Sequence, residues 1–170
     1  MPRESKKDKI LDAAEKILQD ESYDSLSLDH IAKVSGVSKG GLLYHFPTKE
    51  AVLTSLVTRL IQKFDDEFDK ELRLGKSDFR LIFLSINMNP KMVSAARGLM
   101  AAVSFNQDLI KPLRDAYTRW DKLIFAQFAS KNEGWRFRIF FDGLFFCSLL
   151  SLPLPSKKEL TDLVREFNLK

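Results

Sequence analysis

The chain has 170 residues, of which 45% are hydrophobic and 29% are charged, and its formal net charge is +4. This length is enough to bury one substantial core and a small second domain, and the modest positive charge suits a polyanionic partner without by itself indicating DNA. No run reaches the roughly 18 apolar residues of a membrane span, and the first residues are too polar for a secretory signal. The sequence therefore predicts a cytoplasmic protein that has no membrane partner.

Cysteine and histidine usage argues against metal and disulfide chemistry. The chain holds one cysteine, Cys147, and two histidines, without paired-ligand spacing. Cys147 lies in a strongly apolar run, where a thiol normally behaves as a small buried hydrophobe. We therefore expect no internal disulfide, no metal site and no cofactor.

The first pair of short helices follows an amphipathic helix at Lys9 to Leu18. Ser27 is expected to cap a helix whose buried stripe consists of Leu28, Ile31, Ala32 and Val34. Gly36 suits the left-handed conformation that ends a helix sharply, and Ser38 caps the next helix after a turn of about four residues. Two short helices joined in this way are typical of a helix-turn-helix unit.

The second helix, 38–46, has an unusual outer face. Leu42 and Phe46 are expected to face inward, which leaves Lys39, Gly40, Leu43, Tyr44 and His45 mostly on other faces. Two glycines each cost about 1 kcal/mol of helix propensity, and close approach to a phosphate backbone would explain them. The unit therefore predicts a DNA-reading surface. Its predicted contacts are Arg3, Lys6, Ser27, Ser38, Lys39, Gly40, Gly41, Leu43, Tyr44, His45 and Lys49.

Two alternatives remain open at this point. The segment 44–50 can simply connect two core helices, with a buried tyrosine and histidine. The basic amino-terminal segment can lie along phosphates as an arm, or it can be a solvated tail.

The rest of the chain is predicted to be helical throughout. Apolar residues at three-four spacing indicate a long connector helix of about 24 residues at 48–73. Further helices are expected at 78–86, at 90–105 after the cap Asn89, from about 109 to 130, at 135–152 and after the cap Ser156. Residues 132–134 are expected to be a non-helical break between the helix that ends near 130 and the helix at 135–152. The fold class is therefore all-α, with about nine helices.

The last two helices indicate self-association. The helix at 135–152 is apolar nearly all round and the terminal helix is amphipathic, so together they need more partners than one small bundle offers. A two-fold four-helix interface supplies them, and burial inside one protomer is the alternative. The predicted interface consists of Phe145, Leu149, Leu152, Leu160, Leu163, Val164 and Phe167.

The amino-terminal third resembles the TetR family of bacterial transcriptional repressors. The family's pattern is matched by Tyr23, Ser27, Ile31, Ala32, Gly36, Val37, Tyr44, His45, Phe46 and Lys49. Two positions depart from it: Ser22 stands where glycine is frequent, and Gly41 replaces a residue that is often Thr, Ala or Ser. The second departure puts the operator sequence in doubt, not DNA binding itself.

The resemblance implies a domain arrangement and a function. It implies a DNA-binding domain at 1–47 and an effector-binding and dimerisation domain at 48–170. It also implies a dimer that binds a pseudo-palindromic operator and is released when a small molecule shifts the connector helix. The aromatic composition of the carboxy-terminal part is compatible with an apolar effector. Candidate pocket residues are Phe64, Met92, Arg97, Met100, Phe105, Trp120, Phe137, Arg138, Phe141 and Asp142.

Three alternatives accompany this interpretation. The aromatic residues can be ordinary core, with Arg138 and Asp142 pairing only with each other. The protein can be a helix-turn-helix adaptor or constitutive DNA binder without an effector. An enzyme is less expected, because the apolar helices carry almost none of the clustered titratable groups that acid–base catalysis needs.

Overall fold

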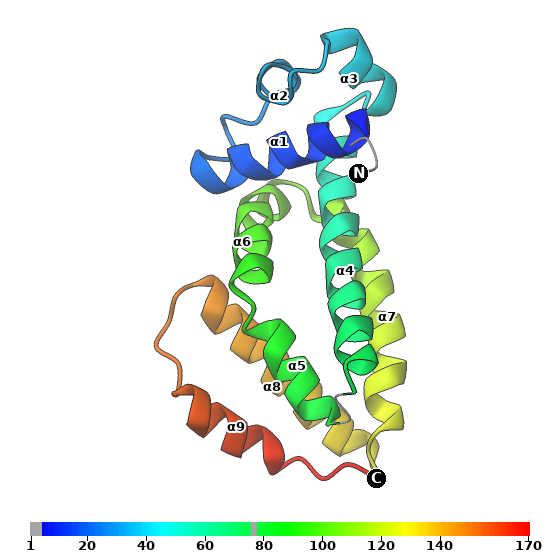
Figure 1. Cartoon of the computed structure of the whole chain (residues 1–170), viewed down its shortest axis with the longest axis vertical. Helices are drawn as coiled ribbons and strands as arrows, with labels where there is room; N and C mark the ends of the chain where they lie inside the picture. Colours follow the sequence, from blue (N-terminus) through cyan, green and yellow to red (C-terminus); the bar gives the residue numbers. More distant parts are fainter. Residues whose placement is uncertain (1–4, 76–77) are drawn as a thin grey trace. The chain divides into compact units, whose positions relative to one another are not determined.

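A computed structural model describes residues 5–75 and 78–170, except for the side chains of 101–102 and 104–105. The described residues form nine α-helices and one 3-10 turn, and no strand occurs among them (Figure 1), which confirms the all-α prediction. The helices are α1 (Lys6–Asp20), α2 (Leu28–Ser35), α3 (Lys39–His45), α4 (Lys49–Arg73), α5 (Phe79–Asn87), α6 (Pro90–Phe105), α7 (Lys111–Ala126), α8 (Lys131–Leu149) and α9 (Lys157–Arg165), with the 3-10 turn at Gln107–Ile110.

The chain divides into two compact units, and α4, α6 and α7 each contribute to both. The first unit contains the described residues up to Leu60 together with Ala95–Pro112, and the second contains Ile61–Ser94 and Leu113–Lys170. The first unit therefore extends beyond the predicted boundary at residue 47. The division at 47 and 48 stays a prediction about function.

The core of the first unit lies between α1, α2 and α3, which all contact one another. Ile10, Ala14 and Ile17 are fully or almost fully buried on one face of α1, and Ile31 is the buried residue of α2. Val34 is 42% exposed, so the predicted stripe of α2 is narrower than expected. Val34 lies in the last turn of α2, and the next buried apolar residues are Val37 in the following turn and Leu42 on α3.

The carboxy-terminal half of α6 is held against α1 within this unit. A Cβ at Gly98 would lie 3.1 Å from Cβ of Leu18, so the absence of a side chain permits the close approach of the two helices. Arg59 of α4 forms an ion pair with Asp12 of α1. Both contacts join segments that are distant in sequence to the first three helices.

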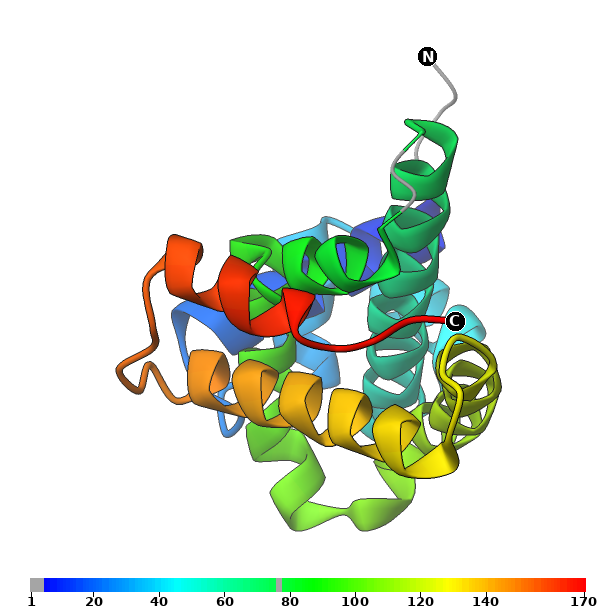
Figure 2. The same cartoon turned by 90° about the horizontal axis from the view of Figure 1, so that it is seen from below.

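The second unit has an aromatic core, built where α5 packs on α8 and α9 (Figure 2). Phe137 is fully buried, and its ring centroid lies 5.4 Å from Phe83, 4.6 Å from Phe141 and 5.1 Å from Phe128. Edge-to-face and tilted pairs of this kind contribute about 0.5 to 1.5 kcal/mol each beyond the area that they bury. The phenylalanines of this half therefore pack mainly against one another.

Arg80 fixes the carboxy-terminal end of α9. Its guanidinium donates to both carboxylate oxygens of Asp78 at 2.9 Å, and its Nη1 donates to the carbonyls of Arg165 at 2.9 Å and Phe167 at 2.8 Å. The last carbonyls of a helix lack intrahelical partners, so a cation at this position also suits the helix dipole. The hydrogen bonds from Arg80 hold the pKa of Asp78 below its ordinary value.

The predicted interruption at 132–134 is wrong, because α8 already begins at Lys131. Ser130 caps it by accepting a hydrogen bond from the amide of Glu133 at 3.2 Å. Gly134 is a packing requirement rather than a break, since a Cβ there would collide with the ring of Phe125. The preceding helix, α7, correspondingly ends at Ala126, short of the expected end near residue 130, and Leu123 on it is 52% exposed.

Candidate nucleic-acid interface

The turn between α2 and α3 has the predicted helix-turn-helix geometry. The hydroxyl of Ser27 accepts from the amide of His30 at 3.1 Å, and that of Ser38 accepts from the amide of Gly41 at 3.2 Å, so each serine caps its helix. Gly36 adopts the left-handed conformation with φ 67°. Local side chains alone therefore set where both helices start and where the first one ends.

The two faces of α3 separate as the spacing predicts. Leu42 is 0% exposed and Phe46, which directly follows the helix, is 2% exposed, so these two side chains anchor α3 to the unit. On the opposite side Tyr44 is 85% exposed and Leu43 is 39% exposed. The Tyr44 ring lies edge-on to His45, with centroids 5.2 Å apart. An exposed tyrosine of this kind can donate to a phosphate or touch a thymine methyl group.

The two glycines of α3 have different reasons to be there. A Cβ at Gly41 would lie 3.1 Å from Oγ of Ser38 and 3.2 Å from a methyl group of Val37, so packing within the unit already favours glycine. A Cβ at Gly40 would meet nothing within 4 Å. Close approach of another molecule, which the sequence suggested as the reason for both glycines, therefore remains the explanation for Gly40 alone.

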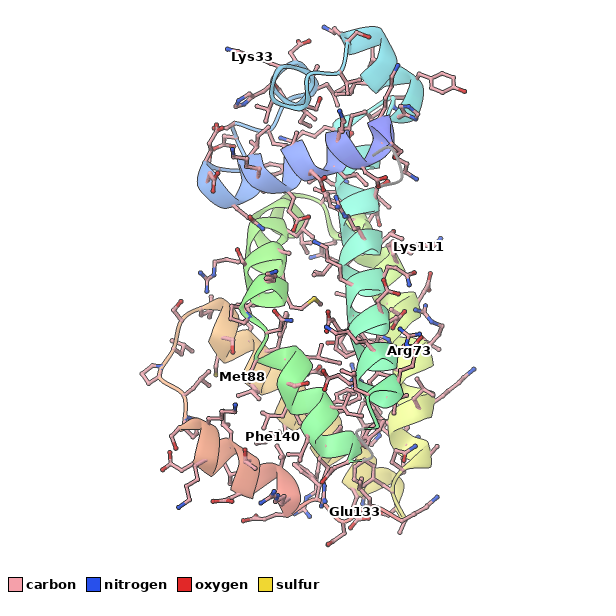
Figure 3. All side chains as sticks on the ribbon, in the orientation of Figure 1. Lys33, Arg73, Met88, Lys111, Glu133 and Phe140 are labelled. Carbon is pink, nitrogen blue, oxygen red and sulfur yellow. The ribbon has the colours of Figure 1, made fainter. Side chains whose placement is uncertain are left out.

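Exposed lysines open α1 and α3 and lie on α2. Lys39 is the first residue of α3, and its amine lies 2.8 Å from a carboxylate oxygen of Asp29 on α2. Lys33 is exposed and extends outward from α2 (Figure 3), and Lys6, the first residue of α1, is exposed too. Arg3 lies outside the described residues.

Lys49 is held inside the unit. Its amine donates to the backbone carbonyl of Tyr23 at 3.2 Å and lies 3.8 Å from the centroid of the Tyr23 ring. The sequence predicted that this amine contacts a phosphate, whereas in the structure it ties the start of α4 to the loop after α1. The signal for this pairing, an aromatic residue before α2 and a lysine after α3, was visible only as a family pattern.

The predicted pocket residues do not form one group. Phe137 and Phe141 are buried in the aromatic core, and the ring of Phe64 lies against Trp120 at 4.5 Å. The Trp120 indole donates to Asp65 at 2.7 Å. Met92 is also buried in the second unit, whereas Arg97 and Met100, 43% exposed, belong to the first unit. The side chain of Phe105 lies outside the described residues.

Arg138 and Asp142 are part of a polar cluster between α7 and α8. Arg138 lies 3.4 Å from Asp142 and 3.3 Å from Asp121, and the Tyr117 hydroxyl donates to Asp142 at 2.8 Å. Burial raises the pKa of Asp142, and burial together with the neighbouring Asp142 raises the pKa of Tyr117. The pairing of Arg138 with Asp142, one of the alternatives that the sequence left open, is therefore present, and Asp121 adds a second carboxylate to it.

The predicted interface residues divide by burial. Leu149, Leu160 and Val164 are at most 7% exposed, so their side chains are enclosed by their own protomer. Leu152 and Leu163 are 46% and 39% exposed, and Phe145 and Phe167 are half-buried.

Three exposed apolar residues on α8 and at its carboxy-terminal end were not among the residues predicted from the sequence. Ile139 is 63% exposed, Phe146 is 51% exposed and Leu150 is 54% exposed. A groove of about 630 Å³ lies beside these residues and is lined by residues of α8, including Phe140 (Figure 3), and by Leu163 and Phe167. The signal was their helical spacing, with Phe146 two turns after Ile139 and Leu150 one turn after Phe146, and this spacing is hard to recognise when other faces of the helix are apolar too.

Two further properties concern the described residues only. None of their helices is long and apolar enough to cross a membrane. No group of three or more histidine, cysteine or acidic side chains is placed to hold a metal ion within the same part of the chain.

Two family models match the chain. Residues 10–56 match the model described as bacterial regulatory proteins, tetR family, and residues 80–168 match the tetracyclin repressor-like, C-terminal domain. The first match contains the whole α2–turn–α3 unit, and the second covers more than half of the chain by itself.

Individual relatives agree with these models. The transcriptional regulator EthR of Mycolicibacterium smegmatis is 36% identical over 69 residues, which are 41% of this chain and 32% of EthR, so the match spans about a third of that relative. A TetR-family structure from Streptomyces coelicolor has a TM-score of 0.74 at 14% identity and covers 96% of this chain and 98% of its own. The multidrug binding protein EbrR, complexed with imidazole, has a TM-score of 0.67 at 14% identity and covers 97% of this chain and 96% of its own.

These structures share the fold, and the family models connect it to the sequence over both units. The chain therefore belongs to the TetR family of bacterial regulatory proteins.

Proposed function

We propose that this protein is a transcriptional repressor that binds a pseudo-palindromic DNA operator as a homodimer through α3. The observation that carries the proposal is the outer face of α3, where Tyr44 is 85% exposed beside Leu43, Lys39 and the open Gly40. Because the buried side chains of Leu42 and Phe46 anchor α3 to its own unit, the opposite face is a rigid surface, which suits the major groove. A bacterial protein of this function works in the cytoplasm, with the chromosome.

The proposed dimer uses the exposed apolar residues of α8 and α9. Ile139, Phe146, Leu150 and Leu163 leave an apolar surface that water covers in a single protomer, and removing it from water favours association. A two-fold axis would let two copies of α3 enter successive major grooves, about 34 to 36 Å apart. The interface is thus proposed for exposed residues, with Leu152, Phe145 and Phe167 at its margin.

Selection of bound sequences from random duplexes tests the DNA proposal. We expect a palindrome whose half-sites lie one helical turn apart, because a dimer reads the same sequence twice. Tyr44→Ala should weaken binding to every duplex without changing the melting temperature, since the side chain is mostly in solvent. A full-length protein that selects no sequence, or a Tyr44→Ala variant with unchanged affinity, would remove α3 from the reading role.

Sedimentation tests the interface. Ile139→Glu and Leu163→Glu should yield monomers with poor operator affinity, because each places a charge in the apolar surface. Leu123→Glu is the matched control: Leu123 is a similarly exposed leucine, and it lies on α7, which the proposed interface does not include. A dimer that survives both α8 and α9 substitutions, or is lost equally in the control, would move the interface elsewhere.

An apolar small-molecule effector that releases the operator is the second part of the proposal. The aromatic side chains of the second unit provide the apolar surroundings, and the polar cluster around Arg138 and Asp142 provides anchoring groups. EbrR, which has the same fold, is described as a multidrug binding protein, so small organic compounds are the first class to test. The required difference in affinity between the two arrangements is about 1 to 3 kcal/mol.

A constitutive DNA binder is the alternative function. It is favoured by the ring-on-ring packing of Phe83, Phe137 and Phe141, which fills the core with the protein's own side chains. Release of the palindrome by one compound of a chemical library would support the effector-responsive repressor. Retained binding across the whole library would support the constitutive binder.

A further inference from the structure

The proposed DNA-reading helix, α3, has an ion pair at its amino-terminal end. The amine of Lys39 lies 2.8 Å from Oδ1 of Asp29, and both side chains are largely in solvent, with 62% and 72% of their surfaces exposed. Asp29 stands in the first turn of α2 and Lys39 opens α3, so the pair bridges the two helices of the helix-turn-helix unit.

Lys39 is the one formal cation that α3 has at neutral pH. The helix reads Lys-Gly-Gly-Leu-Leu-Tyr-His, so Lys39 is its one lysine or arginine. The other cation expected beside it, Lys49, is held against Tyr23. The outer face of α3 therefore meets a polyanion with its single positive charge already matched by a carboxylate.

We propose that Asp29 is a specificity-determining residue of the DNA-reading surface, acting through Lys39. This inference rests on the proposed function of α3. A lysine ammonium has three donors, so Lys39 can keep the bond to Asp29 and still donate to a base edge in the groove. A phosphate has to compete with the Asp29 carboxylate for the same amine, and the carboxylate also repels the DNA backbone.

The effect differs between the operator and other sequences. On random duplexes binding rests mostly on phosphate contacts, so the competing carboxylate lowers affinity there. On the operator Asp29 orients the Lys39 amine toward a base edge, so the carboxylate lowers affinity for the operator less than it lowers affinity for random DNA. An exposed ion pair is weak, which limits its effect to about fivefold in affinity. Asp29 thus increases the ratio of specific to non-specific binding.

Asp29→Asn in the full-length protein tests this. Binding to the selected palindrome and to a random duplex is measured by fluorescence anisotropy over a range of salt concentrations. We expect affinity for the random duplex to rise about two- to fivefold and affinity for the palindrome to rise less, with the salt dependence on random DNA steeper by up to about one counterion. Asp29→Glu, which keeps the charge, should retain most of the discrimination.

A matched control separates this effect from net charge. Asp24 is an exposed carboxylate of the same unit, and Asp24→Asn changes the net charge equally while leaving the Asp29–Lys39 pair in place. That variant should raise both affinities by the same factor. Equal discrimination in Asp29→Asn and Asp24→Asn would overturn the proposal.

A double-mutant cycle shows whether Asp29 acts through Lys39. In a Lys39→Met background Asp29→Asn should change discrimination no more than Asp24→Asn does, because the amine that it positions is gone. An undiminished effect in that background would also overturn the proposal. Failure of the proposed function looks different: the wild-type protein then selects no palindrome, and no ratio of affinities exists to be altered.

Discussion

The contact between Tyr23 and Lys49 should stabilise the first unit and act on DNA only indirectly. We consider two substitutions, Lys49→Met and Tyr23→Leu. The first removes a charged donor to the Tyr23 carbonyl at 3.2 Å and a cation above the ring at 3.8 Å. The second removes the ring but leaves both the carbonyl and the lysine charge.

The structure sets the expected magnitudes. A hydrogen bond from a charged group contributes about 1.5 to 3 kcal/mol and a cation–π contact about 0.5 to 1 kcal/mol, and the half-buried position of Lys49 favours the lower values. We expect Lys49→Met to lower the free energy of unfolding by about 1 to 2 kcal/mol, or about 2 to 8 °C in melting temperature for a chain of this size. Tyr23→Leu should lower it by about 1 kcal/mol through the lost ring.

Denaturant unfolding of the two single variants and the double variant measures the coupling. We expect a coupling energy of at least about 0.5 kcal/mol, and strictly additive effects would refute the contact. A salt titration of DNA binding supplies the second readout. Because the amine is engaged by Tyr23, the slope of affinity against salt should be unchanged in Lys49→Met; a slope shallower by about one ion would instead make Lys49 a phosphate contact.

Four further predictions concern other parts of the chain. Gly40→Ala should raise the melting temperature, since alanine is favoured by about 1 kcal/mol in a helix and its Cβ meets nothing, while gel-shift titration should show about tenfold weaker operator binding; unchanged binding would argue against close approach there. Arg80→Ala should destabilise the protein by about 2 to 3 kcal/mol in denaturant unfolding, because the end of α9 loses two donors. The lowered pKa of Asp78 means that the stability it contributes is present above its ordinary pKa of 3.8 and is lost as the pH falls through the folded value, so the deficit of Asp78→Asn should shrink in melts at acid pH. Asp142 has the opposite sign: burial raises its pKa, so its charged form disfavours folding at neutral pH, and Asp142→Asn should be at least as stable as wild type at pH 7, with a melting temperature that gains less on acidification.

Much of the candidate site was predictable from the sequence because its determinants are local. Ser27, Gly36 and Ser38 act within four residues of themselves, and the inward spacing of Leu42 and Phe46 follows from the helical repeat. The pairs that set the charge of the surface were not predictable. Lys49 meets Tyr23 from 26 positions away, and no local rule selects that partner over a phosphate.

In the carboxy-terminal half the sequence determined that helices form, and roughly where. Pro90 begins α6 and Ser156 caps α9 as expected. The missing amide hydrogen of proline and the capping hydroxyl of serine each act locally, so neither effect depends on the fold around it. Only the tertiary structure decided which apolar side chains are covered. Leu149 and Leu150 are adjacent and equally hydrophobic, yet one is 7% exposed and the other 54%, because this segment is apolar on more than one side and the rest of the protomer covers only part of it.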